Sequence, residues 1–121
     1  MEGRNTGSEL SKPTIKVYYD CDALSVSDFI GVLLGIEEEG IPYEVQEVHE
    51  SDVLELAYNA SLDSRLGVGV GISKQGIVLQ YEKLEKAAPL FRIKLYKKEL
   101  FRSIGANAAR LVKKMPFKPL S

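Results

Sequence analysis

The chain has 121 residues, of which 45% are hydrophobic and 27% are charged, a composition typical of one globular domain. None of its apolar runs approaches the roughly 20 residues that a bilayer span needs, and its N-terminus lacks the hydrophobic stretch of a secretion signal. The single cysteine, Cys21, excludes an internal disulfide framework and fits a reducing compartment. These features predict a soluble, cytoplasmic protein without a membrane partner.

The first part of the chain predicts a lead-in followed by one domain. Residues 1–13 form the lead-in, which we expect to be flexible, and residues 14–121 form a single α/β domain. The β-branched and aromatic run at residues 14–20 (TIKVYYD) predicts a strand. A helix is expected from about Val26 to Glu39, because a near capping box precedes it and a glycine and a proline follow it.

The rest of the chain continues this alternation of strands and helices. Strands are expected at residues 43–48, 67–73, 77–81 and 89–96, with helices after a cap at Ser51 or Asp52 and from Glu99 to about Lys114. A tight turn at residues 74–76 would pair the third and fourth strands as a hairpin. This order predicts a three-layer α/β domain with a mostly parallel sheet of about five strands, one of them antiparallel.

Basic residues gather toward the C-terminus, although the formal net charge is only −1. Residues 92–121 hold nine Lys or Arg and one acidic residue, Glu99. Such an asymmetry is found on nucleic-acid surfaces and on faces that dock an acidic partner, but also on an ordinary solvated helix. The aromatic stacking pattern of single-strand binders does not accompany these charges, so an RNA-binding module is only an alternative interpretation.

Few residues follow a pattern that predicts catalysis. The glycines of residues 67–71 (GVGVG) are followed by another strand, whereas a dinucleotide-binding loop needs a helix after its glycines. Asp20 and Asp22 lie at the carboxyl end of the first strand, where open α/β sheets tend to bind ligands, but two carboxylates that flank a turn are more often turn formers and caps. Cys21 and His49 would act as nucleophile and base only if distant segments happened to meet. We therefore predict that the chain has no catalytic residue.

The predicted helix at residues 26–39 has an unusual face. On a helical wheel its apolar residues fill a broad arc, and the gap in the arc holds Gly31, Gly35 and Glu38, while Glu37 turns back toward the arc. Glycine inside a helix costs about 1 kcal/mol relative to alanine. Glutamates at the C-terminal end also oppose the helix dipole. This stripe is either a groove for a partner, with Glu38 offered to it or to a hard cation such as Mg²⁺, or a solvated face.

Four stretches of the chain resemble a known family. They are residues 33–45 (LLGIEEEGIPYEV), 67–73 (GVGVGIS), 89–91 (PLF) and 105–120 (GANAARLVKKMPFKPL). In this order and spacing they resemble the small subunit of the reactivating factor for adenosylcobalamin-dependent glycerol and diol dehydratases. The resemblance extends from about residue 14 to residue 120 and is weakest at the basic residues 92–104.

The resemblance implies a fold, an assembly and a mode of action. The fold would be similar to the dehydratase β subunit and to anticodon-binding domains. The chain would assemble with a large, chaperone-like ATPase subunit, two large plus two small chains, and only the large chain would bind ATP or ADP. The complex would exchange damaged cobalamin in the dehydratase for intact coenzyme, as the small subunit trades places with the dehydratase β subunit. The small chain alone would bind no cobalamin.

The resemblance also selects one residue. In the family, the middle glutamate of the EEE run reaches a Mg²⁺ site at the contact with the large subunit, and that glutamate is Glu38 here. The partner-binding residues predicted on the helix face are therefore Gly31, Gly35 and Glu38, with Glu38 as the metal ligand.

Two alternatives stay beside this interpretation. The first is the β (medium) subunit of the dehydratase itself, a longer chain that contributes cobalamin contacts. The second is the RNA-binding module, whose affinity would fall steeply with ionic strength. Whether the target acts on glycerol or on propanediol, and whether the complex works inside a bacterial microcompartment, are left open by the sequence.

Overall fold

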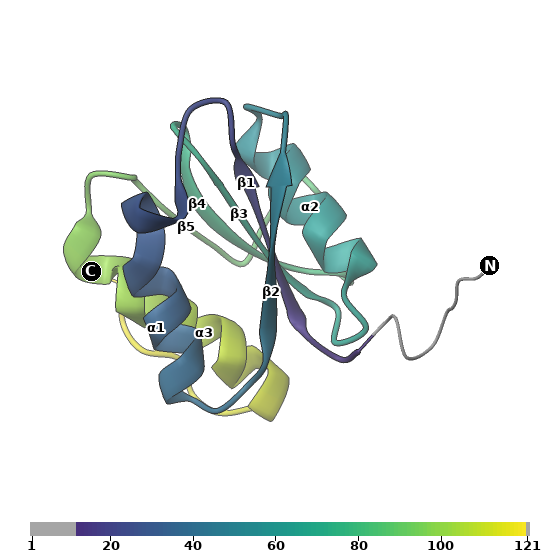
Figure 1. Cartoon of the computed structure of the whole chain (residues 1–121). Helices are drawn as coiled ribbons and strands as arrows, with labels where there is room; N and C mark the ends of the chain where they lie inside the picture. Colours follow the sequence, from purple (N-terminus) through teal and green to yellow (C-terminus); the bar gives the residue numbers. More distant parts are fainter. Residues whose placement is uncertain (1–11, 121) are drawn as a thin grey trace.

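The structure, a computed structural model, describes residues 12–120, so most of the predicted lead-in at residues 1–13 lies outside the described part. Figure 1 shows the strands and helices in chain order: β1 (Ile15–Asp20), η2 (Val26–Phe29), α1 (Ile30–Glu38), β2 (Tyr43–Val48), α2 (Val53–Asp63), β3 (Val68–Ser73), β4 (Gly76–Tyr81), β5 (Phe91–Ile93), η3 (Lys98–Leu100) and α3 (Phe101–Lys113). The order of strands and helices agrees with the one predicted from the sequence.

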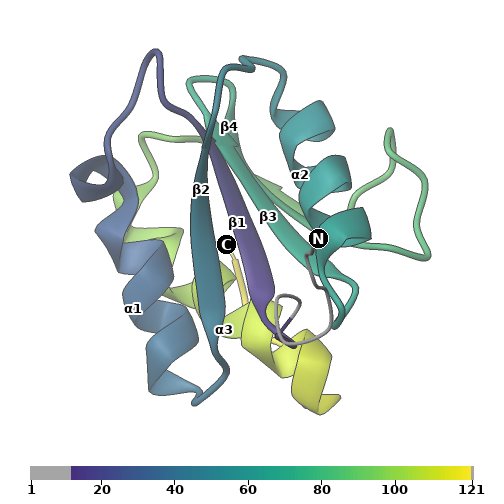
Figure 2. The same cartoon turned by 45° about the vertical axis from the view of Figure 1, so that its right-hand side comes forward.

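The sheet has the strand order β2-β1-β3-β4-β5. Strand β1 is parallel to both β2 and β3, whereas β4 is antiparallel to both β3 and β5, so β4 is the one reversed strand. Helices α1 and α3 cover one face of the sheet and α2 covers the other (Figures 1 and 2). The predicted three-layer α/β domain with a mixed five-stranded sheet is confirmed.

The boundaries differ from prediction where the chain leaves the sheet or enters a helix. Strand β5 is shorter than the predicted residues 89–96, because only Phe91–Ile93 pair with β4. Two predicted helices begin with a 3-10 turn, η2 and η3. Asp52, rather than Ser51, caps α2, since its carboxylate accepts hydrogen bonds from the backbone N–H groups of Leu54 and Glu55.

The glycines of β3 let helix α2 lie close to the sheet. A Cβ atom at Gly69 would lie 2.2 Å from the backbone nitrogen of Ser61, and one at Gly71 would lie 2.4 Å from that of Ala57. Both distances are far below van der Waals contact, so only glycine fits. The GVGVG run is thus a packing feature of the central strand.

The glycine stripe of α1 faces helix α3 of the same chain. A Cβ atom at Gly35 would lie 2.2 Å from the carbonyl oxygen of Arg102, and one at Gly105 would lie 2.0 Å from a carbonyl oxygen of α1. Gly35 is buried, and Gly31 is half-buried against Phe101. The prediction that Gly35 lies in an open groove for a partner is wrong, because α3 fills that groove, whereas the role of Gly31, which keeps part of its surface exposed, stays a prediction.

Replacing Gly35 by alanine should therefore destabilise the domain. The added methyl group overpacks the α1–α3 contact, which typically costs about 1–3 kcal/mol and exceeds the roughly 1 kcal/mol that alanine gains inside a helix. Urea denaturation should show a lower free energy of unfolding for Gly35→Ala. Gly31→Ala is the control, since its nearest atom is the Phe101 Cβ at 3.1 Å, which can give way more easily than backbone. Equal stability of Gly35→Ala and wild type would contradict this packing.

Candidate functional site

The three glutamates at the end of α1 have different surroundings. Glu37 is exposed and accepts a hydrogen bond of 3.1 Å from the Tyr43 hydroxyl. The Glu38 side chain is 52% exposed, and its Oε2 lies 3.0 Å from Nη1 of Arg102 on α3. The Glu39 side chain is only 13% exposed. The expectation that Glu37 turns inward is therefore wrong, and Glu39 is the glutamate held against the protein.

Glu39 joins the end of α1 to the end of α3. The Nζ of Lys113 donates to Glu39 Oε1 and to its backbone carbonyl oxygen, both at 2.8 Å. Nε and Nη2 of Arg110 each lie 3.2 Å from the other carboxylate oxygen, Oε2. These bonds, first that from Lys113 and then that from Arg110, lower the pKa of the Glu39 carboxyl. Two cations in the last turn of α3 thus anchor the glutamate run.

The C-terminal tail is fastened to the same helix. Asn107 is fully buried, and its side-chain amide donates to the backbone oxygen of Lys118 at 2.9 Å and accepts from its N–H at 2.6 Å. Arg110 donates to the Pro116 carbonyl oxygen at 3.1 Å, and the Phe117 ring meets Phe91 edge-on at 5.1 Å. Residues of the run GANAARLVKKMPFKPL therefore hold the C-terminal tail against α3.

Removing the charge of Glu39 should lower the thermal midpoint at neutral pH. A carboxyl with a lowered folded-state pKa stabilises the fold above its unfolded-state pKa, and this stabilisation is lost as the pH falls through the folded-state value. Thermal melts should thus separate Glu39→Gln from wild type at neutral pH, with the gap narrowing in acid. Glu38→Gln, at an exposed position, is the control. A gap of constant size across this pH range would show that the ion pairs do not cause it.

Glu38 is one of the two exposed carboxylates of the glutamate run, with Glu37. Ile30 and Leu34 precede it at four-residue spacing along α1, and Ile30 is 48% exposed. Within residues 12–120, Glu38 belongs to no group of three metal-ligating side chains. One exposed carboxylate fits Mg²⁺ as a single ligand, with its other ligands supplied by water or by another chain. Glu38 could therefore supply at most one ligand to such a cation, and only after Arg102 gives up its ion pair with the carboxylate.

Some of the basic residues near the C-terminus form ion pairs between α3 and the end of α1. Arg102 pairs with Glu38, and Arg110 and Lys113 pair with Glu39. These three cations have partners within the chain, which weakens the case for a phosphate-binding surface. No helix of the described residues is long and apolar enough to cross a bilayer.

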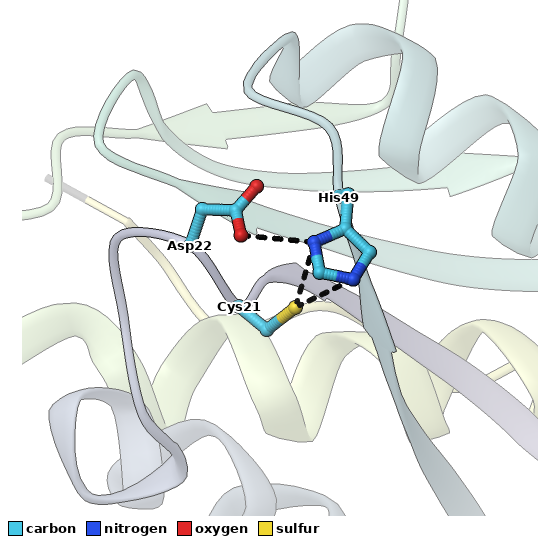
Figure 3. A group of neighbouring side chains, drawn as sticks. All are labelled: Cys21, Asp22 and His49. Carbon is cyan, nitrogen blue, oxygen red and sulfur yellow. Dashed lines mark hydrogen bonds and ion pairs between the residues drawn. The ribbon is translucent and has the colours of Figure 1, made fainter.

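A second group of side chains lies beyond the carboxyl ends of β1 and β2 (Figure 3). Cys21 Sγ is 3.6 Å from Nδ1 and 3.9 Å from Nε2 of His49, and His49 Nδ1 is 2.9 Å from Oδ1 of Asp22. The two strands are parallel with Asp20 opposite Val48, so the next residues, Cys21 and His49, emerge side by side. The proximity of Cys21 and His49, which the sequence could not predict, therefore follows from the register of β1 and β2.

The surroundings of Cys21 do not activate it as a nucleophile. Burial, followed by the charges of Asp22 and Glu47, raises the pKa of its thiol, whereas a catalytic thiol needs a lowered pKa. The hydrogen bond and charge of Asp22 raise the pKa of His49. Asp20 is buried and accepts the backbone N–H of Asp22 at 3.1 Å, which is the turn-forming role expected from the sequence.

Similarity to known proteins defines the class to which this fold and site belong. Residues 12–118 match the family of the dehydratase medium subunit, and the chain belongs to this family. The propanediol dehydratase-reactivating factor small subunit of Citrobacter freundii is 43% identical over 113 residues, which cover 92% of this chain and 95% of that protein. The main interpretation of the sequence is thereby confirmed.

Solved structures agree with this relationship. A chain in the structure of diol dehydratase-reactivating factor complexed with ADP and Mg²⁺ superposes with a TM-score of 0.81 at 38% identity, covering 90% of this chain and all (100%) of that chain. A chain of glycerol dehydratase reactivase superposes with a TM-score of 0.84 at 29% identity, and the match covers 91% of this chain and 100% of that chain. A small subunit of a reactivating factor is favoured over the medium subunit of the dehydratase and over an RNA-binding module.

Proposed function

We propose that this chain is the small, non-catalytic subunit of a chaperone-like factor that releases damaged cobalamin from an adenosylcobalamin-dependent glycerol or propanediol dehydratase. The observation that carries the proposal is its 43% identity to a reactivating-factor small subunit over nearly the whole of both chains. Its partner is a large ATPase subunit, in a complex of two large and two small chains. ATP and ADP bind the large subunit, and the complex works in the cytoplasm.

The mechanism is competition between two partners for one small chain. The small subunit leaves the large subunit and takes the place of the dehydratase β subunit, which loosens the cobalamin site. Nucleotide in the large subunit can drive this exchange only if it changes the affinity between large and small chains. The small chain itself then needs a binding surface and no catalytic group.

Glu38 supports this exchange as a contact to the large subunit. In the free chain Arg102 pairs with its carboxylate, and Ile30 offers apolar surface on the same side of α1. When bound, Mg²⁺ would link Glu38 to oxygen ligands of the large subunit. Arg102 holds the carboxylate at the surface until the partner arrives and must give up this ion pair on assembly.

Glu38→Gln should weaken binding to the large subunit when Mg²⁺ is present. The change keeps the size of the side chain and removes its charge, so we expect a dissociation constant larger by on the order of tenfold, the scale of one charge-assisted contact. Calorimetric titration of the large subunit measures this constant. A chelator should weaken the wild-type complex and largely erase the difference between the two chains.

Glu37→Gln is the matched control for that titration. Glu37 directly precedes Glu38 and is exposed. Glu39 is unsuitable as a control, because it forms ion pairs with α3 and its substitution would destabilise the fold. The control should bind as wild type does. Unchanged affinity of Glu38→Gln in Mg²⁺ would overturn the role of this residue while leaving the assignment as a small subunit intact.

A further inference from the structure

Cys21, Asp22 and His49 form the one group of three potential metal ligands among residues 12–120. Their ligand atoms all lie within 4.8 Å of one another, and the three side chains come from two loops that follow neighbouring strands (Figure 3). None of the three contributes to the contact around Glu38. A surface ion pair between His49 and Asp22 would give a role to two of these side chains and none to the thiol.

The three side chains lie close enough to hold a tetrahedral cation of the zinc type after small rotations. Bonds of about 2.3 Å to sulfur and about 2.0–2.1 Å to nitrogen place the two ligand atoms roughly 3.6 Å apart around a tetrahedral centre. Sγ of Cys21 and Nδ1 of His49 are 3.6 Å apart, but Sγ is also 3.9 Å from Nε2, so the thiol lies against the ring and the exposed imidazole has to turn before Nδ1 points to a cation shared with Sγ. The 2.9 Å between Nδ1 and Oδ1 of Asp22 needs to widen by only a few tenths of an ångström. Both of these side chains are mostly exposed, at 79% and 65%, so they are free to make this adjustment.

The chemistry of the three ligands selects the kind of cation. A thiolate, an imidazole and a carboxylate together favour Zn²⁺, Co²⁺ or Ni²⁺, whereas Mg²⁺ and Ca²⁺ prefer oxygen ligands alone. The negative charges of Asp20, Asp22 and Glu47 act on the thiol and favour a cation beside it. The geometry is less suited to a Cys–His catalytic pair, because the nitrogen nearer to the thiol also faces Asp22.

We propose that Cys21, Asp22 and His49 bind one divalent cation of the zinc type at the carboxyl end of β1 and β2. On binding, the thiol proton of Cys21 and any proton on Nδ1 of His49 pass to solvent, so that Sγ and Nδ1 coordinate the cation while neutral His49 keeps its proton on Nε2. Three protein ligands leave the fourth position open to water or to a group of another chain, as in metal sites that exchange a ligand. This site is separate in place and in ligand type from Glu38.

Titration of the untagged, reduced chain with Co²⁺ in excess Mg²⁺ tests the proposal. We expect saturable binding of one Co²⁺ per chain with the absorption of a thiolate–cobalt bond, and displacement by Zn²⁺. Cys21→Ser should abolish the thiolate absorption. Cys21→Ser, His49→Ala and Asp22→Asn should each weaken binding by on the order of 10–100-fold, at least the loss seen when a supporting residue of a metal site is removed.

Glu50→Gln is the matched control, since Glu50 adjoins His49 and lies outside the group of three. It should bind Co²⁺ as wild type does. His49 and Asp22 are exposed, whereas Cys21 and Glu50 are half-buried, so circular dichroism is used to check that each variant is folded. Absence of the thiolate absorption in wild type, or equal Co²⁺ affinity for wild type, Cys21→Ser and His49→Ala, would overturn the site.

Discussion

Helices α1 and α3 touch through their backbones, because at Gly35 and Gly105 a single methyl group would collide with a carbonyl oxygen of the other helix. This close approach decides where the polar side chains at the helix ends lie. It brings Lys113 and Arg110 onto Glu39 and leaves Glu38 outside with Arg102. The surface proposed to meet the large subunit is therefore a consequence of the internal contact.

The two most distinctive motifs of the chain meet in this contact. LLGIEEEG provides the end of α1, and GANAARLVKK provides α3 and its last turn. Asn107 then fixes the tail that follows α3. Much of what makes these motifs recognisable serves packing, and Glu38 differs because its side chain is half exposed and is held by one ion pair. Many of the other residues of these motifs pack within the chain, whereas the side chain of Glu38 is exposed enough to contact a partner.

The fold could be predicted from local sequence patterns, but the packing of the glycine face of α1 against α3 could not. Strand β2 has the predicted bounds, because its alternating residues and flanking turn signals are local. The wheel of the predicted helix placed Gly35 in a gap of the apolar arc, yet a wheel of one helix cannot show that another helix of the same chain fills the gap. The missing signal was in α3, where Gly105 and Ala109 give a matching stripe of small residues.

The pairing of Cys21 with His49 illustrates a different limit. Both residues follow strands whose ends were predicted, but their meeting depends on β1 and β2 being parallel neighbours in one particular register. Local periodicity gives a strand its faces and leaves its neighbours undetermined. With the register known, the two proposed cation sites differ in place and in ligands: one oxygen ligand at Glu38, the last residue of α1, and a mixed S, N, O set beyond the carboxyl ends of β1 and β2.

The central claim is that the outer side of α1, positioned by α3, is the surface that binds the large subunit. Cross-linking tests it most directly, with a photoreactive residue at Ile30 on α1 compared with one at Leu62 on α2, which covers the opposite face of the sheet. The two positions are similarly apolar and similarly exposed, at 48% and 50%. The account predicts that the residue at position 30 cross-links to the large subunit and that the one at position 62 does not. Cross-linking from position 62 alone would contradict it.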